Sequence, residues 1–198
     1  MKDLSLHIFD IVENSVKAGA KTVTLEFCWH DTVFSFCITD DGPGFSKRVR
    51  KDPANPFKTT RKERKVGLGL ALLKDSAEQC GGKIKIGEGG KGGVKIEADF
   101  DISHIDSKPV GDMEDLIVTC MSAWPQMDFI VKIGDGHEEI LNTVQIKAEL
   151  DEINMNSPEA RNFISRQLSS DFQPLYAWLS KIKLRIDSSL QKKNTPLD

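Results

Sequence analysis

Apolar and polar positions repeat with two different periods over the first forty residues. Four apolar residues recur at helical spacing between residues 4 and 17, namely Leu4, Ile8, Ile11 and Val12. Gly19 suits the C-terminal end of that helix. Residues 23–27 and 34–38 are apolar at every second position, which is the period of half-buried strands. The pattern therefore predicts a helix followed by a β-hairpin.

The same two periods return after a long central loop. A glycine-containing segment at 66–70 leads into a predicted helix that ends near Cys80. Alternating residues at 84–86 and 94–100 predict a second hairpin. The order helix, hairpin, loop, helix, hairpin predicts an α+β fold. We expect a two-layer α/β sandwich, with a mostly antiparallel mixed sheet and helices on one face.

A change of pattern near Ser107 predicts a domain boundary, with one domain at 1–106 and a small helix-rich domain of unknown role at 107–198. Ser157 and Pro158 are typical of the first residues of a helix. The expected elements of the second segment are helices at 113–124, 143–150, 157–168 and 172–190, with a kink near Pro174, and a strand at 129–133.

Composition narrows the classes of function. The chain has 198 residues, 39% of them hydrophobic, and a net charge of −3, which argues against general nucleic-acid binding. It has no apolar run long enough to span a bilayer and no signal region, so we expect a soluble, cytoplasmic protein without membrane contact. The four cysteines have irregular spacing, which favours reduced thiols over a metal site.

One segment has a charge opposite to that of the whole chain. Residues 47–65 contain nine basic and two acidic residues and show no sustained helical or strand periodicity. A long loop of this kind is either a solvated surface loop or an electrostatic lid over a polyanion. The segments that flank it favour the lid.

Polar groups gather at three places around this loop. His7, Asp10, Asn14 and Lys17 share an arc of about 80° on the first predicted helix, opposite its apolar face. Residues 40–44 combine two carboxylates with a glycine turn, and such a carboxylate can accept a hydrogen bond from adenine. Residues 67–70 open a helix whose free N–H groups favour phosphate. Each feature alone is more typical of an ordinary surface helix, turn or helix start than of a binding site.

The ordered combination is more specific. Segments 10–20, 40–44, 56–60 and 67–70 resemble the N, G1, F and G2 boxes of the gyrase, heat-shock chaperone, histidine kinase and mismatch-repair ATPases, the GHKL superfamily with the Bergerat ATP-binding fold. The third segment is most similar to its counterpart in anti-sigma-factor serine kinases. The resemblance covers about half the chain and implies ATP and Mg²⁺ as cofactors.

The resemblance also implies roles for single residues. Asn14 would be the Mg²⁺ ligand and Lys17 a phosphate contact, while Asp40 would bind the adenine amine. Gly42 and Gly44 would let the chain pass close to the base. The further ATP contacts that it implies are Phe45, the lid residues Thr59, Thr60, Arg61 and Lys65, and the phosphate loop Gly67, Leu68, Gly69 and Leu70.

The sequence departs from the family pattern in three ways. Asp10 stands where hydrolysing members carry a Glu that activates water, and its side chain is one methylene shorter. Val94 follows Gly93 where the family often has Gly-Thr, so a polar contact to the base pocket is lost. No His-containing helical dimerisation segment precedes the domain, and no phosphoacceptor within the chain is evident.

Three functions fit these features. The first is a kinase that transfers the terminal phosphate of ATP to a His or Ser of a partner protein in signalling. The second is an ATP-hydrolysing conformational switch with Asp10 as the base, and the third is a non-catalytic ATP-binding regulator. A homodimer through the C-terminal helices is compatible with all three.

Overall fold

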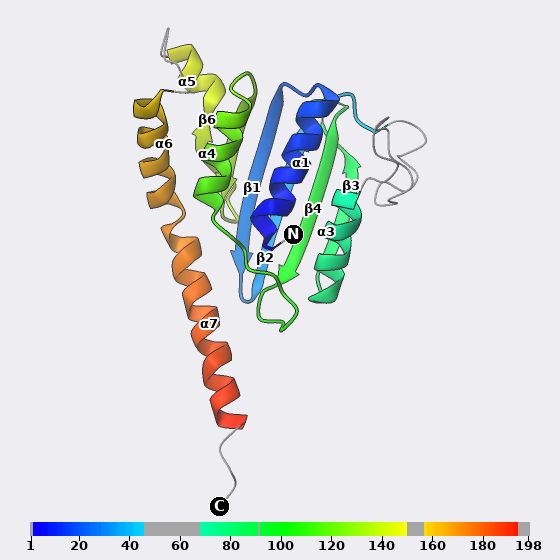
Figure 1. The fold of residues 1–198 in the computed structure, drawn as a ribbon, viewed down its shortest axis with the longest axis vertical. Helices are drawn as coiled ribbons and strands as arrows, with labels where there is room; N and C mark the ends of the chain where they lie inside the picture. Colours follow the sequence, from blue (N-terminus) through cyan, green and yellow to red (C-terminus); the bar gives the residue numbers. More distant parts are fainter. Residues whose placement is uncertain (1, 46–67, 91, 150–156, 194–198) are drawn as a thin grey trace, which may run out of the picture.

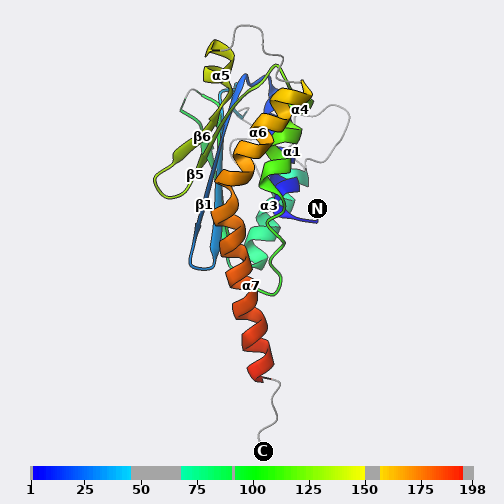
Figure 2. The same ribbon diagram turned by 90° about the vertical axis from the view of Figure 1, so that its left-hand side faces the viewer.

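The computed structural model describes residues 2–45, 68–90, 92–149 and 157–193. Its elements follow one another as α1 Leu4–Ala18, β1 Thr22–His30, β2 Val33–Asp40, α3 Leu68–Gln79, β3 Lys83–Glu88, β4 Val94–Asp101, α4 Met113–Ala123, β5 Asp128–Ile133, β6 Glu138–Asn142, α5 Thr143–Glu149, α6 Pro158–Asp171 and α7 Gln173–Lys193. Helices α1, α3 and α4 cover one face of the sheet (Figures 1 and 2). The predicted α+β sandwich is confirmed.

The six strands form one sheet in the order β3-β4-β2-β1-β5-β6. Only β1 and β5 are parallel, and every other neighbouring pair among these strands is antiparallel. The predicted alternation holds, since Val23, Leu25 and Phe27 of β1 point into the core under the helices. Strand β6 was not predicted, because this short edge strand begins with two glutamates and lacks alternating apolar residues.

Helix α1 has a defined residue at each end. The Asp3 carboxylate accepts the N–H of Leu6 at 3.0 Å, which caps the N-terminus. Gly19 ends the helix with φ +88°, a left-handed conformation that glycine adopts readily. The predicted apolar face is buried. These two caps fix the length and the position of the helix that carries most of the polar candidates.

The chain after residue 101 returns to α1 before it enters the next helix. The carbonyl groups of Pro109 and Val110 accept the N–H groups of Leu4 and Ser5, at 2.9 and 3.1 Å. We call residues 102–112 the connector. It leads into α4, which packs on α1, and then into β5, which pairs with β1. Elements on both sides of residue 107 thus share one sheet and one core, and the division into domains at 106/107 stays a prediction.

Helix α6 packs against α4 and the edge strand β6, and α7 continues beside β1 (Figure 2). Helix α6 begins as predicted, with the Ser157 hydroxyl accepting the N–H of Ala160 at 3.1 Å. It ends at Asp171, and Pro174 lies in the first turn of the separate helix α7. Between them, the Phe172 ring packs edge-on against Phe27 of β1 at 5.7 Å between ring centres. None of the described helices has the length and apolar character needed to cross a membrane.

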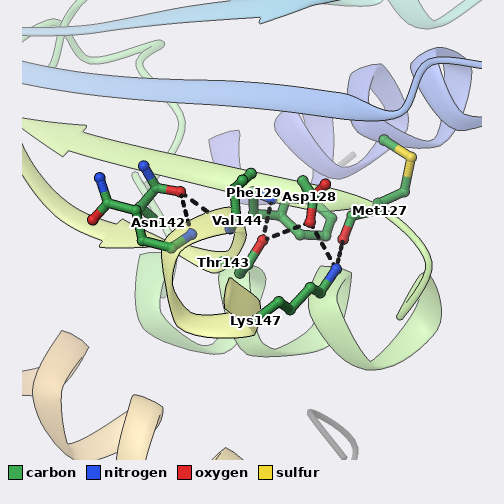
Figure 3. A network of polar contacts seen from close by, with 8 residues as sticks. Met127, Asp128, Phe129, Asn142, Thr143, Val144 and Lys147 are labelled. Carbon is green, nitrogen blue, oxygen red and sulfur yellow. Dashed lines mark hydrogen bonds and ion pairs between the residues drawn. The ribbon is translucent and has the colours of Figure 1, made fainter. Parts of the chain in front are cut away.

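A polar network attaches α5 to the beginning of β5 (Figure 3). The Thr143 hydroxyl accepts the N–H of Phe129 at 2.8 Å and donates to Asp128 Oδ1 at 3.3 Å. Lys147 Nζ donates to the same carboxylate oxygen at 2.7 Å. The side chain of Asn142 caps the helix by accepting the N–H of residue 144 at 3.1 Å. The predicted helix at 143–150 is therefore present through residue 149 and is anchored by side chains at its start.

Candidate functional site

Asp40 ends β2 as a buried carboxylate that is held by groups from three separate segments. Its Oδ1 accepts the N–H of Gly42 at 2.9 Å and the N–H of Val94 at 3.1 Å. Its Oδ2 accepts the hydroxyl of Ser15 at 2.8 Å. The residue is only 7% exposed, and a buried carboxylate needs such donors to offset its lost hydration. These bonds fix the carboxylate between α1, the turn after β2 and the first residue of β4.

The Asp40 carboxylate retains capacity for another donor. A carboxylate has about four lone-pair positions, and the described contacts use two on Oδ1 and one on Oδ2. Oδ2 therefore has a lone-pair position that the described contacts do not use. The hydroxyl of Ser15 would then orient the carboxylate for that donor. Ser15 was not among the predicted site residues, although it directly follows Asn14 in the sequence.

Two glycine turns pack against each other beside this carboxylate. A Cβ on Gly93 would overlap the backbone carbonyl of Asp40 and lie 2.7 Å from its Oδ1. Gly44 has φ +70°, and its Cα faces the carbonyl of Gly92. Gly42 is buried at the same turn, and Phe45 is half-buried at the end of the described stretch. Residue 93 must therefore be glycine, because any side chain there would overlap Asp40. The next residue, Val94, binds Asp40 through its backbone N–H.

Asp10, Asn14 and Gly69 lie together on the helical side of the site. The Asn14 amide donates from Nδ2 to Asp10 Oδ2 at 3.2 Å, one turn back along α1. A Cβ on Gly69 would overlap that same carboxylate oxygen. Glycine is therefore the residue that lets the first turn of α3 approach α1 this closely. The structure brings together two segments that lie more than fifty residues apart in the sequence.

The donor set beside Asp10 suits a hard cation. Asn14 directs its amide nitrogen to Asp10, so its amide oxygen points away from that carboxylate. Amide and carboxylate oxygens are ligand types that Mg²⁺ binds, and Mg²⁺ sites at triphosphates need few protein ligands. The described residues contain no cluster of three or more His, Cys, Asp or Glu arranged around one metal position. The residues here that could contribute oxygen ligands to a metal ion are Asp10 and Asn14.

Lys17 lies in the last turn of α1 on its exposed side. Its Nζ is 2.6 Å from Glu13 Oε1, an ion pair of the i,i+4 type on the helix surface. Exposed pairs of this kind contribute little to stability, so Lys17 can exchange Glu13 for another anion at small cost. The structure does not bring Lys17 into contact with Asp10 or Asn14 among the interactions that it describes.

Helix α3 presents its N-terminal turn to this region. Leu68 is exposed, and Gly69 and Leu70 are partly exposed at the first turn. The first N–H groups of a helix have no partner within the helix, and the helix dipole makes that end electropositive. Thr59, Thr60, Arg61, Lys65 and Gly67, which the sequence also assigned to the site, lie outside the described residues.

His7 corrects the expected polar stripe of α1. The sequence placed it with Asp10, Asn14 and Lys17 on one solvent-facing side, but it is only 1% exposed. Its Nε2 is 3.3 Å from Ser76 Oγ on α3 and 3.2 Å from Lys108 Nζ on the connector. Burial, followed by the Lys108 charge, lowers the pKa of His7 from 6.5 to about 4. Helix α1 therefore has a second buried face, toward α3 and the connector, which its apolar periodicity does not reveal.

Comparison with known proteins identifies the fold family. Residues 2–104 match the family of histidine kinase-, DNA gyrase B- and HSP90-like ATPases. The chain belongs to this family. It therefore carries an ATP-binding domain of the histidine kinase-like type, as the order of its sequence motifs predicted.

The chain is similar to parts of two sensor kinases. It is 28% identical over 102 residues to the sensor protein kinase CarS of Pseudomonas aeruginosa, which covers 50% of this chain and 22% of CarS. It is 40% identical over 55 residues to the C4-dicarboxylate transport sensor protein DctB of Rhizobium meliloti, covering 28% of this chain and 9% of DctB. The chain thus spans less than a quarter of the length of either relative.

Two solved structures show partial similarity. The ATP-binding domain of PrrB from Mycobacterium tuberculosis is 25% identical, with a TM-score of 0.37 over 48% of this chain and 64% of that one. The ADP-bound ATPase domain of MutL from Aquifex aeolicus is 13% identical, with a TM-score of 0.42 over 84% of this chain and 70% of that one.

Proposed function

We propose that this domain binds Mg-ATP beside Asp40, Asp10 and Gly69 and transfers the terminal phosphate to a His or Ser of a partner protein. The observation that carries the nucleotide site is the buried Asp40 carboxylate, which is fixed by three donors and still able to accept a fourth. The similarity to segments of sensor kinases supports phosphate transfer over other uses of ATP.

At the adenine end, Asp40 accepts the exocyclic amine of the base. The amine donates to Oδ2, while Ser15 and the backbone N–H groups hold the carboxylate in place. Gly42, Gly44 and Gly93 let the two turns pack closely around this carboxylate, so that the backbone can lie next to the base. A base without that amine would leave the buried carboxylate short of a donor, which favours adenine over guanine.

At the phosphate end, the first turn of α3 provides backbone N–H groups and a positive dipole end. Asn14 would hold Mg²⁺ through its amide oxygen, and the ion, when bound, neutralises and orients the phosphate oxygens. The basic segment 47–65 adds positive charge near this turn in the sequence. Lys17 can exchange Glu13 for a phosphate oxygen.

Asp10 is the proposed catalytic base. Its contact with the Gly69 backbone places the carboxylate next to the phosphate loop, where it can accept a proton from the attacking hydroxyl, imidazole or water. Asp reaches about one methylene less far than Glu, and the absence of a side chain at residue 69 brings α3 closer to it. Phosphoryl transfer depends mainly on positioning and electrostatics, so a weak base in the right place is sufficient.

An ATP-driven conformational switch is the second candidate. It is favoured by the packing of α4 on α1, because this connects residues after 107 to the helix that carries Asp10 and Asn14. The pairing of β5 with β1 joins the same segment to the strand that follows this helix. In that case water, and not a partner side chain, receives the phosphate. A non-catalytic ATP-binding regulator would use the same contacts without turnover.

The test is to incubate the full chain with Mg²⁺ and ATP labelled at its terminal phosphate. Transfer of the label to a co-purified or candidate partner supports the kinase, and its stability in acid or in base distinguishes Ser from His phosphorylation. Release of free labelled phosphate supports the switch instead. Asp10→Asn should abolish turnover and retain ATP binding, and unchanged turnover would rule out Asp10 as the base.

A further inference from the structure

Three polar side chains meet in the interior behind the site, and none of them takes part in the proposed chemistry. His7 comes from α1, Ser76 from α3 and Lys108 from the connector. His7 and Ser76 are 1% and 5% exposed. Lys108 Nζ lies 2.7 Å from Ser76 Oγ and 3.2 Å from His7 Nε2. We call this group the His7–Ser76–Lys108 cluster.

The hydrogen bonds of the cluster allow one consistent arrangement of protons. The Ser76 hydroxyl donates to the carbonyl of Leu72 at 2.8 Å, so its oxygen accepts from the Lys108 ammonium. The ammonium has further donors, and one of them points to His7 Nε2. His7 must then be neutral and carry its proton on Nδ1, which is buried without a partner among the described residues. Lys108 thus donates to a residue of each helix, next to the direct contact of 3.3 Å between Ser76 Oγ and His7 Nε2.

The cluster and the nucleotide site are two ends of one helix–helix contact. On α3, Ser76 lies seven residues after Gly69, which is about two turns of helix. On α1, His7 lies about one turn before Asp10. Since a helix moves nearly as a rigid rod over two turns, a shift of α3 at Ser76 also shifts Gly69. The Gly69–Asp10 contact has no room for such a shift toward α1.

We propose that Lys108 is a positioning residue for the phosphate end of the nucleotide site: by joining Ser76 to His7, it sets the distance between α3 and α1 and so the approach of Gly69 to Asp10. This inference rests on the proposed function. Lys108 also lies on the connector, whose backbone at Pro109 and Val110 binds the N-terminus of α1. Any displacement of α3 therefore acts on the segment that leads to α4 and β5.

The proposal makes Lys108 different from a lysine that only adds stability. Without the ammonium, this cluster keeps only the direct contact between Ser76 and His7, so α3 is held less tightly on α1 and the phosphate contacts weaken. The adenine contacts at Asp40 do not involve α3 among the described interactions and remain unchanged. The affinity for ATP should therefore fall while the affinity for adenosine is retained.

The test compares Lys108→Met with Lys74→Met in the full chain. Lys74 is the matched control, because it lies on α3 and, among the described residues, forms an ion pair with Glu78 at the exposed surface. Amide hydrogen exchange without nucleotide should accelerate about tenfold in α3 of Lys108→Met, with little change in β1 and β2. ATP affinity by calorimetry should fall about fivefold or more, with adenosine affinity by NMR titration unchanged.

A double variant adds an internal check. Because Ser76→Ala removes the same link, adding Lys108→Met to it should cause little further loss of ATP affinity. Unchanged exchange in α3, equal loss of ATP and adenosine affinity, or additive effects of the two substitutions would overturn the proposal. If the unmodified chain binds no ATP, the proposed function fails, while exchange in α3 still decides whether Lys108 holds that helix.

Discussion

Asp40, the residue that we propose to bind adenine, is buried and held by several hydrogen bonds. Its carboxylate lies in an almost closed environment, where Ser15, Gly42 and Val94 each donate a hydrogen bond to it. The same bonds restrict its rotation, so an incoming amine meets an acceptor that is already oriented. Little conformational entropy remains to be lost on binding.

Asp40→Asn tests this role. The amide presents an N–H group where a carboxylate oxygen accepted hydrogen bonds, so ATP affinity should fall by roughly 1–3 kcal/mol, the cost of a mismatched buried polar pair. Asp41→Asn is the matched control, because Asp41 accepts the N–H groups of Lys21 and Thr22 and has no described contact with the turn at 89–93. Equal ATP affinity of Asp40→Asn and the unmodified chain in calorimetry would contradict the adenine assignment.

The lowered pKa of the buried His7 side chain predicts that stability depends on pH. Burial, together with the Lys108 charge, lowers its pKa from 6.5 to about 4, so between these values the unfolded chain binds more protons than the folded one. The free energy of unfolding should therefore decrease as the pH falls from about 6.5 to about 4, by roughly 3 kcal/mol from this residue.

Denaturant unfolding of the chain and of His7→Gln at several pH values measures that contribution. Glutamine can still accept a hydrogen bond from Lys108 but does not titrate, so its curve should be flatter in this window. Other carboxylates titrate equally in both proteins and cancel in the difference. A difference between the two proteins that does not vary with pH would show that His7 is not buried in its neutral form.

At the scale of elements, side chains at the ends of helices decide how each one is attached. Asp3 and Gly19 define α1, and both are recognisable in the sequence as capping residues. Helix α5 is held differently, since Thr143 and Lys147 connect it to Asp128 at the start of β5 (Figure 3). That attachment depends on residues about fifteen to twenty positions apart and has no local signature.

Thr143→Val should destabilise the protein. Threonine and valine have nearly the same shape, but the substitution leaves the buried N–H of Phe129 without its acceptor, which costs about 1–3 kcal/mol. Thr24→Val, on the half-exposed face of β1, makes the same chemical change outside the core and should have a much smaller effect. Chemical denaturation of both variants gives the comparison, and equal stabilities would argue against the role of the network.

At the scale of the whole molecule, β1 is the central link. It pairs with β2 on one side and with β5 on the other, and the elements of residues 107–198 reach the first half through β5, α4 and the connector. Phe172 and Trp178 extend this contact, because Trp178 Nε1 donates to the carbonyl of Asp31 at 3.0 Å. The C-terminal helices are thus tied to the β1–β2 hairpin.

The fragment 1–106 tests the domain boundary predicted from the sequence. We expect it to be clearly less stable than the full chain, because β1 would become an open edge and α1 would lose α4. Thermal unfolding followed by circular dichroism, together with gel filtration, measures stability and aggregation. A monomeric fragment that unfolds at the same temperature as the full chain would instead support two independent domains.

The sequence by itself determined the elements and the family. Helical and strand periods located α1, α3, α4 and both N-terminal hairpins. An element with one buried face needs apolar residues at its own structural period, and this period is visible in the sequence. The glycine and carboxylate motifs identified the ATP-binding family, since backbone approach and ligand chemistry restrict the residue type at single positions. The pairing of Asp10 with Asn14 also follows from helical spacing alone.

Only the tertiary structure decided which distant groups meet. The bond from Ser15 to Asp40, the contact of Gly69 with Asp10 and the burial of His7 with Ser76 and Lys108 all join segments separated by 25 to 101 residues. The pairing of β5 with β1 belongs to the same class. The apolar period of a helix or strand shows only that one of its faces is buried. Which residues pack against that face depends on the tertiary packing of the whole chain.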